Sequence, residues 1–217
     1  MAENKSTHNQ NKKLNRPEVI TVRTWKEYLG ESLLIVFSVV LALGLTELFN
    51  KLHEQQQTKE ILHQLREELI ENKKSAAEQY AYHQQVFEII DSAKNNLAFA
   101  KKFLDSGKVH LNIIFPKGAI LHDLNDVAWQ EAKQNNVVSK IDLGTYSLLT
   151  DIYDNQQRIL NFEPSLEKIL ISYDSRKPEN LQVTLTLIHD VLYGWIVERT
   201  PGLLRSYQKA IDKLSSY

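Results

Sequence analysis

The sequence has no cysteine among its 217 residues. This excludes a fold held together by disulfides and any metal site built from thiolates. Acidic and basic residues nearly balance, with 27 Asp and Glu against 26 Lys and Arg, so the net charge of −1 gives no electrostatic basis for binding nucleic acid. No internal repeat of about 20–50 residues is visible either, which argues against a solenoid.

Motifs of the common enzyme classes are also missing. The chain has no P-loop, no G-x-G-x-x-G, no G-x-S-x-G and no H-E-x-x-H. Two histidine–carboxylate pairs remain, His122 with Asp126 and His189 with Asp190. Such pairs are usually solvated surface neighbours, and the alternative is a metal ligand pair or a base with its orienting group. We predict no catalytic residue, no metal and no cofactor.

What the sequence does contain is an uncharged apolar run, 33–45, between Glu31 and Glu47. The apolar segment 28–49 has 22 residues, close to the roughly 20 that cross a hydrocarbon core about 30 Å thick. Its strictly uncharged part, 32–46, spans only about 23 Å as a helix. Both glutamates are therefore expected at the edges of a membrane, and an ionisable residue there is also a functional hypothesis.

Two other interpretations of this run stay open. A cleaved signal peptide could use the small residues Ala42-Leu43-Gly44, although the polar region before it is longer than such peptides carry. A buried core helix is the other. The preferred interpretation is an uncleaved transmembrane helix, in which Ser38, Ala42 and Thr46 form a strip of small side chains suited to helix association.

Basic residues around the run predict its orientation. Six precede it, and three follow within the next 20 residues: Lys5, Lys12, Lys13, Arg16, Arg23 and Lys26 against Lys51, Lys59 and Arg66. By the positive-inside rule the N-terminus is cytoplasmic and the C-terminal part lies outside the cytoplasm. Residues 1–27, polar and poor in apolar side chains, are expected to be a disordered tail, and 50–61 a solvated stalk.

A long amphipathic helix is predicted after the stalk. Apolar residues recur every three or four positions as a heptad seam that contains Leu62, Leu65, Leu69, Val86, Ile90, Leu97 and Leu104, and Gly107 is the expected C-cap. Asn72, Gln79 and His83 interrupt the seam. Polar residues at such positions either fix the register of the helices or face water. For His83 a third interpretation is a layer whose packing responds to pH.

Shorter elements follow, which together with the long helix predict an all-α bundle over 62–217. Residues 109–115 alternate like a short strand. Helical patterns then cover 119–135 and 181–198. Between them, Asp142 is expected to cap another helix, which is kinked or begins again at Pro164. A last helix is expected to begin at Thr200 and Pro201. Trp129, Tyr153 and Trp195 fall in apolar stripes and are expected in the core.

Two patches of the chain resemble a family of uncharacterised bacterial single-pass membrane proteins. The first is Gly30-Glu31-Ser32 with the run 33–45, followed by Leu65-Arg66-Glu67-Glu68-Leu69 and Asn72; the second is Ala128-Trp129-Gln130-Glu131-Ala132 through Ile141, with Leu149 and Tyr153 downstream. The resemblance implies a bacterial inner-membrane protein with an N-terminal anchor and a helical domain outside the cytoplasm. It implies no activity.

These features predict a membrane-anchored helical scaffold, accessory subunit or interaction module, not an enzyme. Expected partners are the lipid bilayer and either a second copy of the chain or another membrane protein, and no nucleic acid. The alternative is a periplasmic bundle that binds or senses a small molecule. An enzyme using His122, Asp126 or His189, and an ion-coupled subunit using Glu31 or Glu47, are lesser alternatives.

Overall fold

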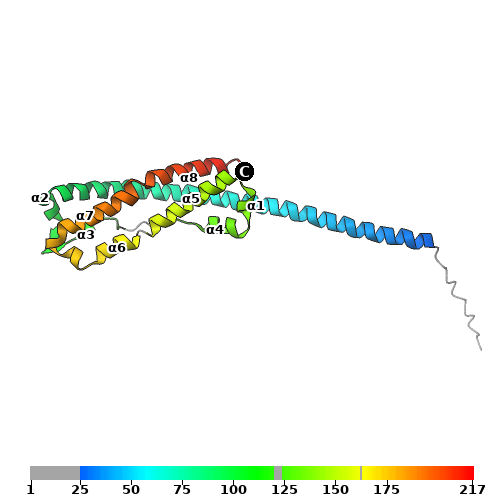
Figure 1. Cartoon of the computed structure of the whole chain (residues 1–217), viewed down its shortest axis with the longest axis horizontal. Coiled ribbons are helices and arrows are strands. Elements are labelled where there is room, and N and C mark those ends of the chain that lie inside the picture. Colours follow the sequence, from blue (N-terminus) through cyan, green and yellow to red (C-terminus); the bar gives the residue numbers. More distant parts are fainter. Residues whose placement is uncertain (1–24, 120–123, 162) are drawn as a thin grey trace, which may run out of the picture. The chain divides into compact units, whose positions relative to one another are not determined.

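The structure is a computed structural model that describes residues 25–119, 124–161 and 163–217. The chain divides into two compact units, Met1–Leu52 and His53–Tyr217, which we describe separately. The fold is all-α, as predicted, and within the described residues the one sheet is a two-stranded hairpin (Figure 1). Residues 1–24 of the predicted tail and His122, one member of the predicted pair with Asp126, lie outside the described residues.

The first unit is helical throughout its described part, because α1 (Trp25–Asn95) begins three residues before the predicted span. Every described side chain from Trp25 to Leu52 is exposed. Leu33, Phe37 and Leu43 expose 69%, 63% and 65% of their surface. This helix is long and apolar enough to cross a membrane, and none of its most apolar 18-residue stretch is buried within the protein, so the core-helix interpretation does not hold for this segment.

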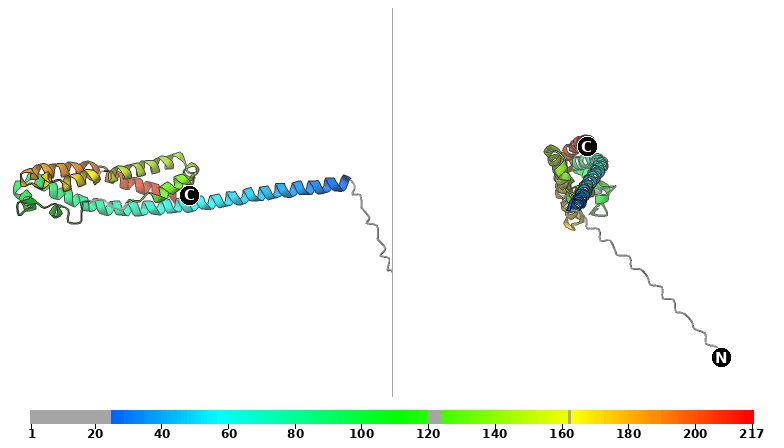
Figure 2. Two further views of the ribbon diagram at one scale, coloured as in Figure 1. Left: turned by 90° about the horizontal axis from the view of Figure 1, so that it is seen from below. Right: turned by 90° about the vertical axis from the view of Figure 1, so that its right-hand side faces the viewer.

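The second unit consists of three long rows of helix. One row is the part of α1 after Leu52, and another is α5 (Leu143–Leu160) followed by α6 (Glu163–Ile171). The third is α7 (Leu181–Leu192), a π-helix η5 (Tyr193–Val197) and α8 (Thr200–Leu214). Figure 1 and the left view of Figure 2 show α7 and α8 following one another along α1. They run antiparallel to it, since His189 pairs with Asp91 while Gln208 bonds Lys73.

Short elements close the two ends of this bundle. At one end lie α4 (Val127–Gln134) and the 3₁₀ turn η2 (Val137–Lys140). At the other lie α2 (Leu97–Ala100), η1 (Lys101–Phe103), the strands β1 (Leu104–Asp105) and β2 (Lys108–Val109), and α3 (Leu111–Ile114). Two further 3₁₀ turns, η3 (Asp174–Arg176) and η4 (Pro178–Asn180), lead into α7.

The core comprises two apolar clusters that follow one another along α1. The α8 cluster joins Ile61–Ala76 of α1 to α4, η2, α5 and α8. The α7 cluster joins Val86–Ala93 of α1 to α2, α3, α6 and α7. Leu62, Leu65, Leu69, Val86 and Ile90 are all at most 5% exposed. These five seam residues are therefore covered by helices of their own chain.

The end of the seam differs from the prediction. Helix α1 stops at Asn95, and Asn96 adopts an extended conformation in which its side chain caps the new helix α2 by accepting from the Phe99 N–H at 3.1 Å. Leu97 is consequently 56% exposed, and Leu104 lies in β1, half-buried. The apolar spacing of the seam continues beyond Asn96, and this spacing alone does not show that Asn96 acts as a helix cap.

Other boundaries need smaller corrections. Gly107 has the expected positive φ (+74°), but with Ser106 (+49°) it turns a β-hairpin and caps no helix. The strand expected at 109–115 is β2 followed by α3. The bundle begins before residue 62, since Glu54 pairs with Lys140 at 2.6 Å and Gln57 bonds Asn135. Asp142 is the predicted N-cap of α5, accepting from the Thr145 N–H at 3.0 Å.

Candidate functional site

The strip of small residues predicted for helix association lies on the exposed surface of α1. Ser38 and Thr46 each donate their hydroxyl proton to a carbonyl four residues earlier in the same helix, of Leu34 at 2.8 Å and Ala42 at 2.9 Å. This satisfies the hydroxyl donors without a partner helix. A second helix packing here would meet small side chains and hydroxyl oxygens that can still accept a hydrogen bond.

The two carboxylates flanking the apolar run are also exposed. Glu31 and Glu47 stand 16 positions apart on one helix, a rise of about 24 Å. That distance is shorter than a hydrocarbon core of about 30 Å. Both side chains can reach the headgroup regions by extending away from the middle of the span.

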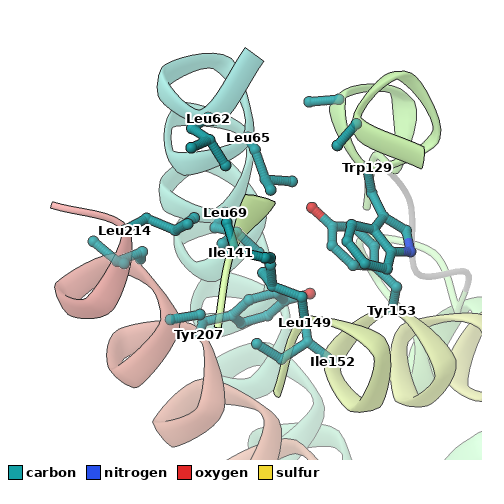
Figure 3. Packing of buried hydrophobic residues seen from close by; sticks show 14 of the residues in the cluster. Leu62, Leu65, Leu69, Trp129, Ile141, Leu149, Ile152, Tyr153, Tyr207 and Leu214 are labelled. Atoms are coloured by element: carbon teal, nitrogen blue, oxygen red, sulfur yellow. The ribbon is translucent and has the colours of Figure 1, made fainter. Parts of the chain in front are cut away.

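Inside the bundle, a polar network crosses the α8 cluster. Its members are Glu68, Asn72, Asn125, Tyr153, Gln156 and Tyr207. Glu68 accepts two hydrogen bonds, from the Tyr153 hydroxyl at 2.7 Å and from the Ala128 N–H at 2.8 Å. The Tyr153 ring stacks on Trp129 with centroids 5.3 Å apart (Figure 3). One carboxylate of α1 thereby fixes both α5 and the start of α4.

Asn72 is the centre of this network. It is fully buried, its Nδ2 donates to the Asn125 carbonyl at 2.7 Å, and its Oδ1 accepts from the Asn125 N–H at 2.8 Å. Gln156 Nε2 donates to the same carbonyl at 2.8 Å, and Gln156 Oε1 accepts from the Tyr207 hydroxyl at 2.9 Å. Asn72 thus forms one donor and one acceptor hydrogen bond with the main chain of Asn125, as a residue of one β-strand does with its neighbour in the next strand.

Burial sets the protonation state of the two phenols. Burial, reinforced by the nearby Glu68 carboxylate, raises the pKa of Tyr153 far above its usual value, and the same two causes raise that of Tyr207. Both therefore stay protonated and act as hydrogen-bond donors. The bonds of the network join separate helices and loops of the bundle, so the network holds these elements together.

An open groove adjoins the network on the outside of the bundle. It has a volume of about 470 Å³ and is lined by His63, Gln64, Glu67, Glu68, Glu71, Asn125, Val127, Ala128 and Glu131. Val127 in its wall is 69% exposed. Glu67 pairs with Arg66 at 3.0 Å. The groove is acidic, and across the described residues no group of three His, Cys, Asp or Glu side chains could hold a metal ion.

His83 lies between the two apolar clusters, buried at 1% exposure. It borders a cavity of about 10 Å³, room for one water molecule, whose other walls include Gln79, Tyr80, Ile196 and Thr200. Neither ring nitrogen makes a hydrogen bond of ordinary geometry within the described residues. Burial lowers the pKa of His83 to about 4, although the backbone carbonyls of Gln79 and Ala119 offset part of this effect. The ring is neutral at pH 7.

His189 is the other histidine singled out by the sequence. Its Nε2 lies 3.3 Å from Asp91 of α1 and its Nδ1 3.1 Å from Asp190, while the ring packs on Phe87 with centroids 4.8 Å apart. These contacts join α7 to α1. Asp126, the remaining member of the other predicted pair, accepts from Gln130 Nε2 at 2.9 Å at the start of α4.

Sequence reasoning missed most of the polar network. Asn72 was visible as a polar interruption of the seam. Glu68 belongs to the first of the two patches on which the family resemblance was based, but it was not singled out. Gln156 and Asn125 gave no signal, because their partners are more than 30 residues away along the chain. In the structure the two patches that carry the family resemblance meet here, through Glu68 and Ala128.

Known proteins add nothing to this geometry: no family model matches the chain, and no curated protein or solved structure is detectably similar to it.

Proposed function

We propose that this protein is a single-pass membrane-anchored interaction module without catalytic activity, whose helical bundle presents binding surfaces outside the cytoplasm. The observation that carries the proposal is the segment 28–49: its apolar side chains are exposed, and the second unit has a complete core without them. An aqueous solvent disfavours such a surface, whereas a bilayer covers it.

We infer that the bundle has no catalytic activity from the way in which its polar groups are bonded. Those of the polar network are bonded to one another or to the main chain, and the His83 cavity has room for only one water. Ligand pockets normally hold several hundred Å³. The His83 cavity is far smaller than that, and the groove beside the polar network, at about 470 Å³, is the place where the small-molecule alternative would have to bind.

Association with a second copy is assigned to the strip Ser38, Ala42 and Thr46. Because Leu62, Leu65, Leu69, Val86 and Ile90 are covered by the chain's own helices, a dimer through these seam residues would require the bundle to open. The exposed strip needs no such rearrangement.

The test of the anchor uses the lack of cysteine. Single cysteines placed by Ser6→Cys and Ser216→Cys in cells are labelled with a membrane-impermeant maleimide before and after lysis. We expect an alkali-resistant membrane protein in which only the Ser216→Cys variant is labelled in intact spheroplasts. Release by alkaline carbonate, or labelling at Ser6→Cys in intact spheroplasts, contradicts the proposal.

Partners are then sought by crosslinking in native membranes and mass spectrometry. A foreign membrane protein linked through the bundle supports an accessory or scaffold role. Links confined to copies of this chain, abolished by Ala42→Leu in the strip, support a homo-oligomer. The matched control is Ala42→Ser, which keeps the side chain small.

A further inference from the structure

The end of the bundle opposite the C-terminus differs in chemistry from the rest of the second unit. We define the hairpin end as residues 96–119 and 171–183, which hold α2, η1, the β-hairpin, α3, η3, η4 and the start of α7. These segments contact one another and gather at one end of the bundle (Figure 1). They carry six Lys or Arg against three Asp or Glu, whereas the second unit as a whole is net acidic.

One of the three acidic residues at the hairpin end is already paired with a lysine. Asp174 forms an ion pair with Lys177 at 2.6 Å, while Asp105 lies 3.7 Å from the imidazole of His110. Four exposed lysines make no ion pair with any described residue: Lys101, Lys102, Lys108 and Lys117. Lys102 and Lys117 instead lie over the rings of Phe99 and Tyr82, at 4.9 and 5.6 Å. The hairpin end therefore presents positive charge to the outside.

Apolar side chains project from the same segments. Leu97, Ile113, Ile171, Tyr173 and Val183 expose 56%, 45%, 66%, 78% and 60% of their surface. Lys177 lies over the Tyr173 ring at 5.0 Å. Exposed Leu, Ile and Tyr interspersed with Lys is the composition of surfaces that rest in the interfacial region of a bilayer, with the amines at the phosphates and the apolar groups below them.

We propose that the hairpin end is a docking surface for an anionic lipid bilayer. Charge complementarity selects the negative headgroups, since each lysine near such a surface contributes attraction that is lost beyond a Debye length. The exposed apolar residues distinguish a bilayer from a soluble polyanion, which offers nothing to cover them. This surface is additional to the anchor proposed for segment 28–49.

The test uses the full chain reconstituted in phosphatidylcholine nanodiscs, so that the anchor is already occupied. These are mixed with vesicles of phosphatidylcholine alone, or of equal parts phosphatidylcholine and phosphatidylglycerol, and floated on a density gradient. A chain that fails to enter nanodiscs counts against the anchor before vesicles are added. We expect co-flotation with the anionic vesicles only, weakening as salt rises.

The decisive variant replaces the four lysines by glutamine: Lys101→Gln, Lys102→Gln, Lys108→Gln and Lys117→Gln. At the attraction typical of a surface lysine, the vesicle affinity should fall by at least about 50-fold. The matched control makes the same change of charge at four other exposed lysines of the second unit: Lys59→Gln, Lys74→Gln, Lys133→Gln and Lys209→Gln. It should lose less than about three-fold, since these positions lie outside the hairpin end.

Three outcomes overturn the proposal. The first is equal loss in both quadruple variants, and the second is no flotation of the unmodified chain with anionic vesicles. The third comes from Leu97→Ser combined with Tyr173→Ser, two exposed positions whose replacement leaves the core intact. This pair should weaken binding at least about five-fold, because apolar groups add to the affinity for a bilayer. Unchanged binding would mean that only charge is recognised, and a bilayer would not be the partner.

Discussion

Replacing Asn72 tests whether the polar network holds the bundle together. In Asn72→Ala the Asn125 N–H loses the acceptor it has at 2.8 Å, while the Asn125 carbonyl keeps the Gln156 donor. A buried donor left without a partner costs about 1–3 kcal/mol, and the truncated side chain leaves a small cavity in addition. We therefore expect the free energy of unfolding to fall by about 2–4 kcal/mol.

The assay is urea unfolding of the full chain in mild detergent, followed by tryptophan fluorescence. Trp129 stacks on Tyr153 beside the network and reports on it directly. Trp25→Phe in every variant removes the signal from the start of α1, and the remaining signal comes from Trp129 and Trp195. The matched control is Asn95→Ala, an exposed asparagine at the end of the same helix, which should change stability by less than about 0.5 kcal/mol.

A double variant sharpens the test. The Asn125 carbonyl accepts from both Asn72 and Gln156, so either single replacement leaves it one donor. Replacing both by alanine leaves the carbonyl unpaired, and the combined loss should exceed the sum of the single losses by about 1 kcal/mol. A loss below 0.5 kcal/mol in Asn72→Ala, or strictly additive losses, would refute the reasoning from the hydrogen bonds.

Three further predictions concern other parts of the bundle. The pKa of His83 is lowered to about 4 from an ordinary 6.5, so the folded state binds fewer protons than the unfolded state; stability should be complete above pH 6.5 and fall by roughly 3 kcal/mol as the pH drops toward 4. Urea titrations at several pH values should show this slope flattened in His83→Leu but kept in a variant of exposed His63, and an unchanged slope in His83→Leu contradicts the assignment. Tyr153→Phe should lose about 1–2 kcal/mol by removing the donor to Glu68, measured by the same unfolding, whereas the half-exposed Tyr146→Phe should not. Asn96→Ala should weaken the cap of α2 by about 1 kcal/mol and speed amide exchange at Phe99, with Asn95→Ala as its control; equal exchange in both would show that the cap contributes nothing.

Local patterns predicted the elements of this protein better than its contacts. The seam from Leu62 to Ile90 is buried and Asp142 caps α5, because apolar periodicity and capping act over a few residues. The same periodicity carried the predicted helix through Leu97, where a single asparagine ends it. At this point two local signals compete: the capping preference of Asn96 favours the end of the helix, and the apolar Leu97 favours its continuation. The sequence pattern does not show which of the two is stronger.

The partners of the polar seam residues could not be predicted from the sequence. Asn72 was expected either to set the register or to face water, and its actual partner is the main chain of Asn125, 53 positions away. Every residue has the same backbone groups, so no side-chain pattern marks which stretch of main chain a buried amide will meet. For the same reason Gln156, which shares that carbonyl, was not singled out.

The order of the helices in the core has a consequence for synthesis. Leu62, Leu65 and Leu69 are synthesised well before Tyr207 and Leu214 of α8, which pack in the same cluster. At translation rates of about 5–20 residues per second, the intervening stretch of about 140 residues takes on the order of ten seconds. During that time the side of this cluster that α8 covers stays exposed. A chaperone would have to shield it, and a transcript truncated before α8 would yield a chain that never buries it.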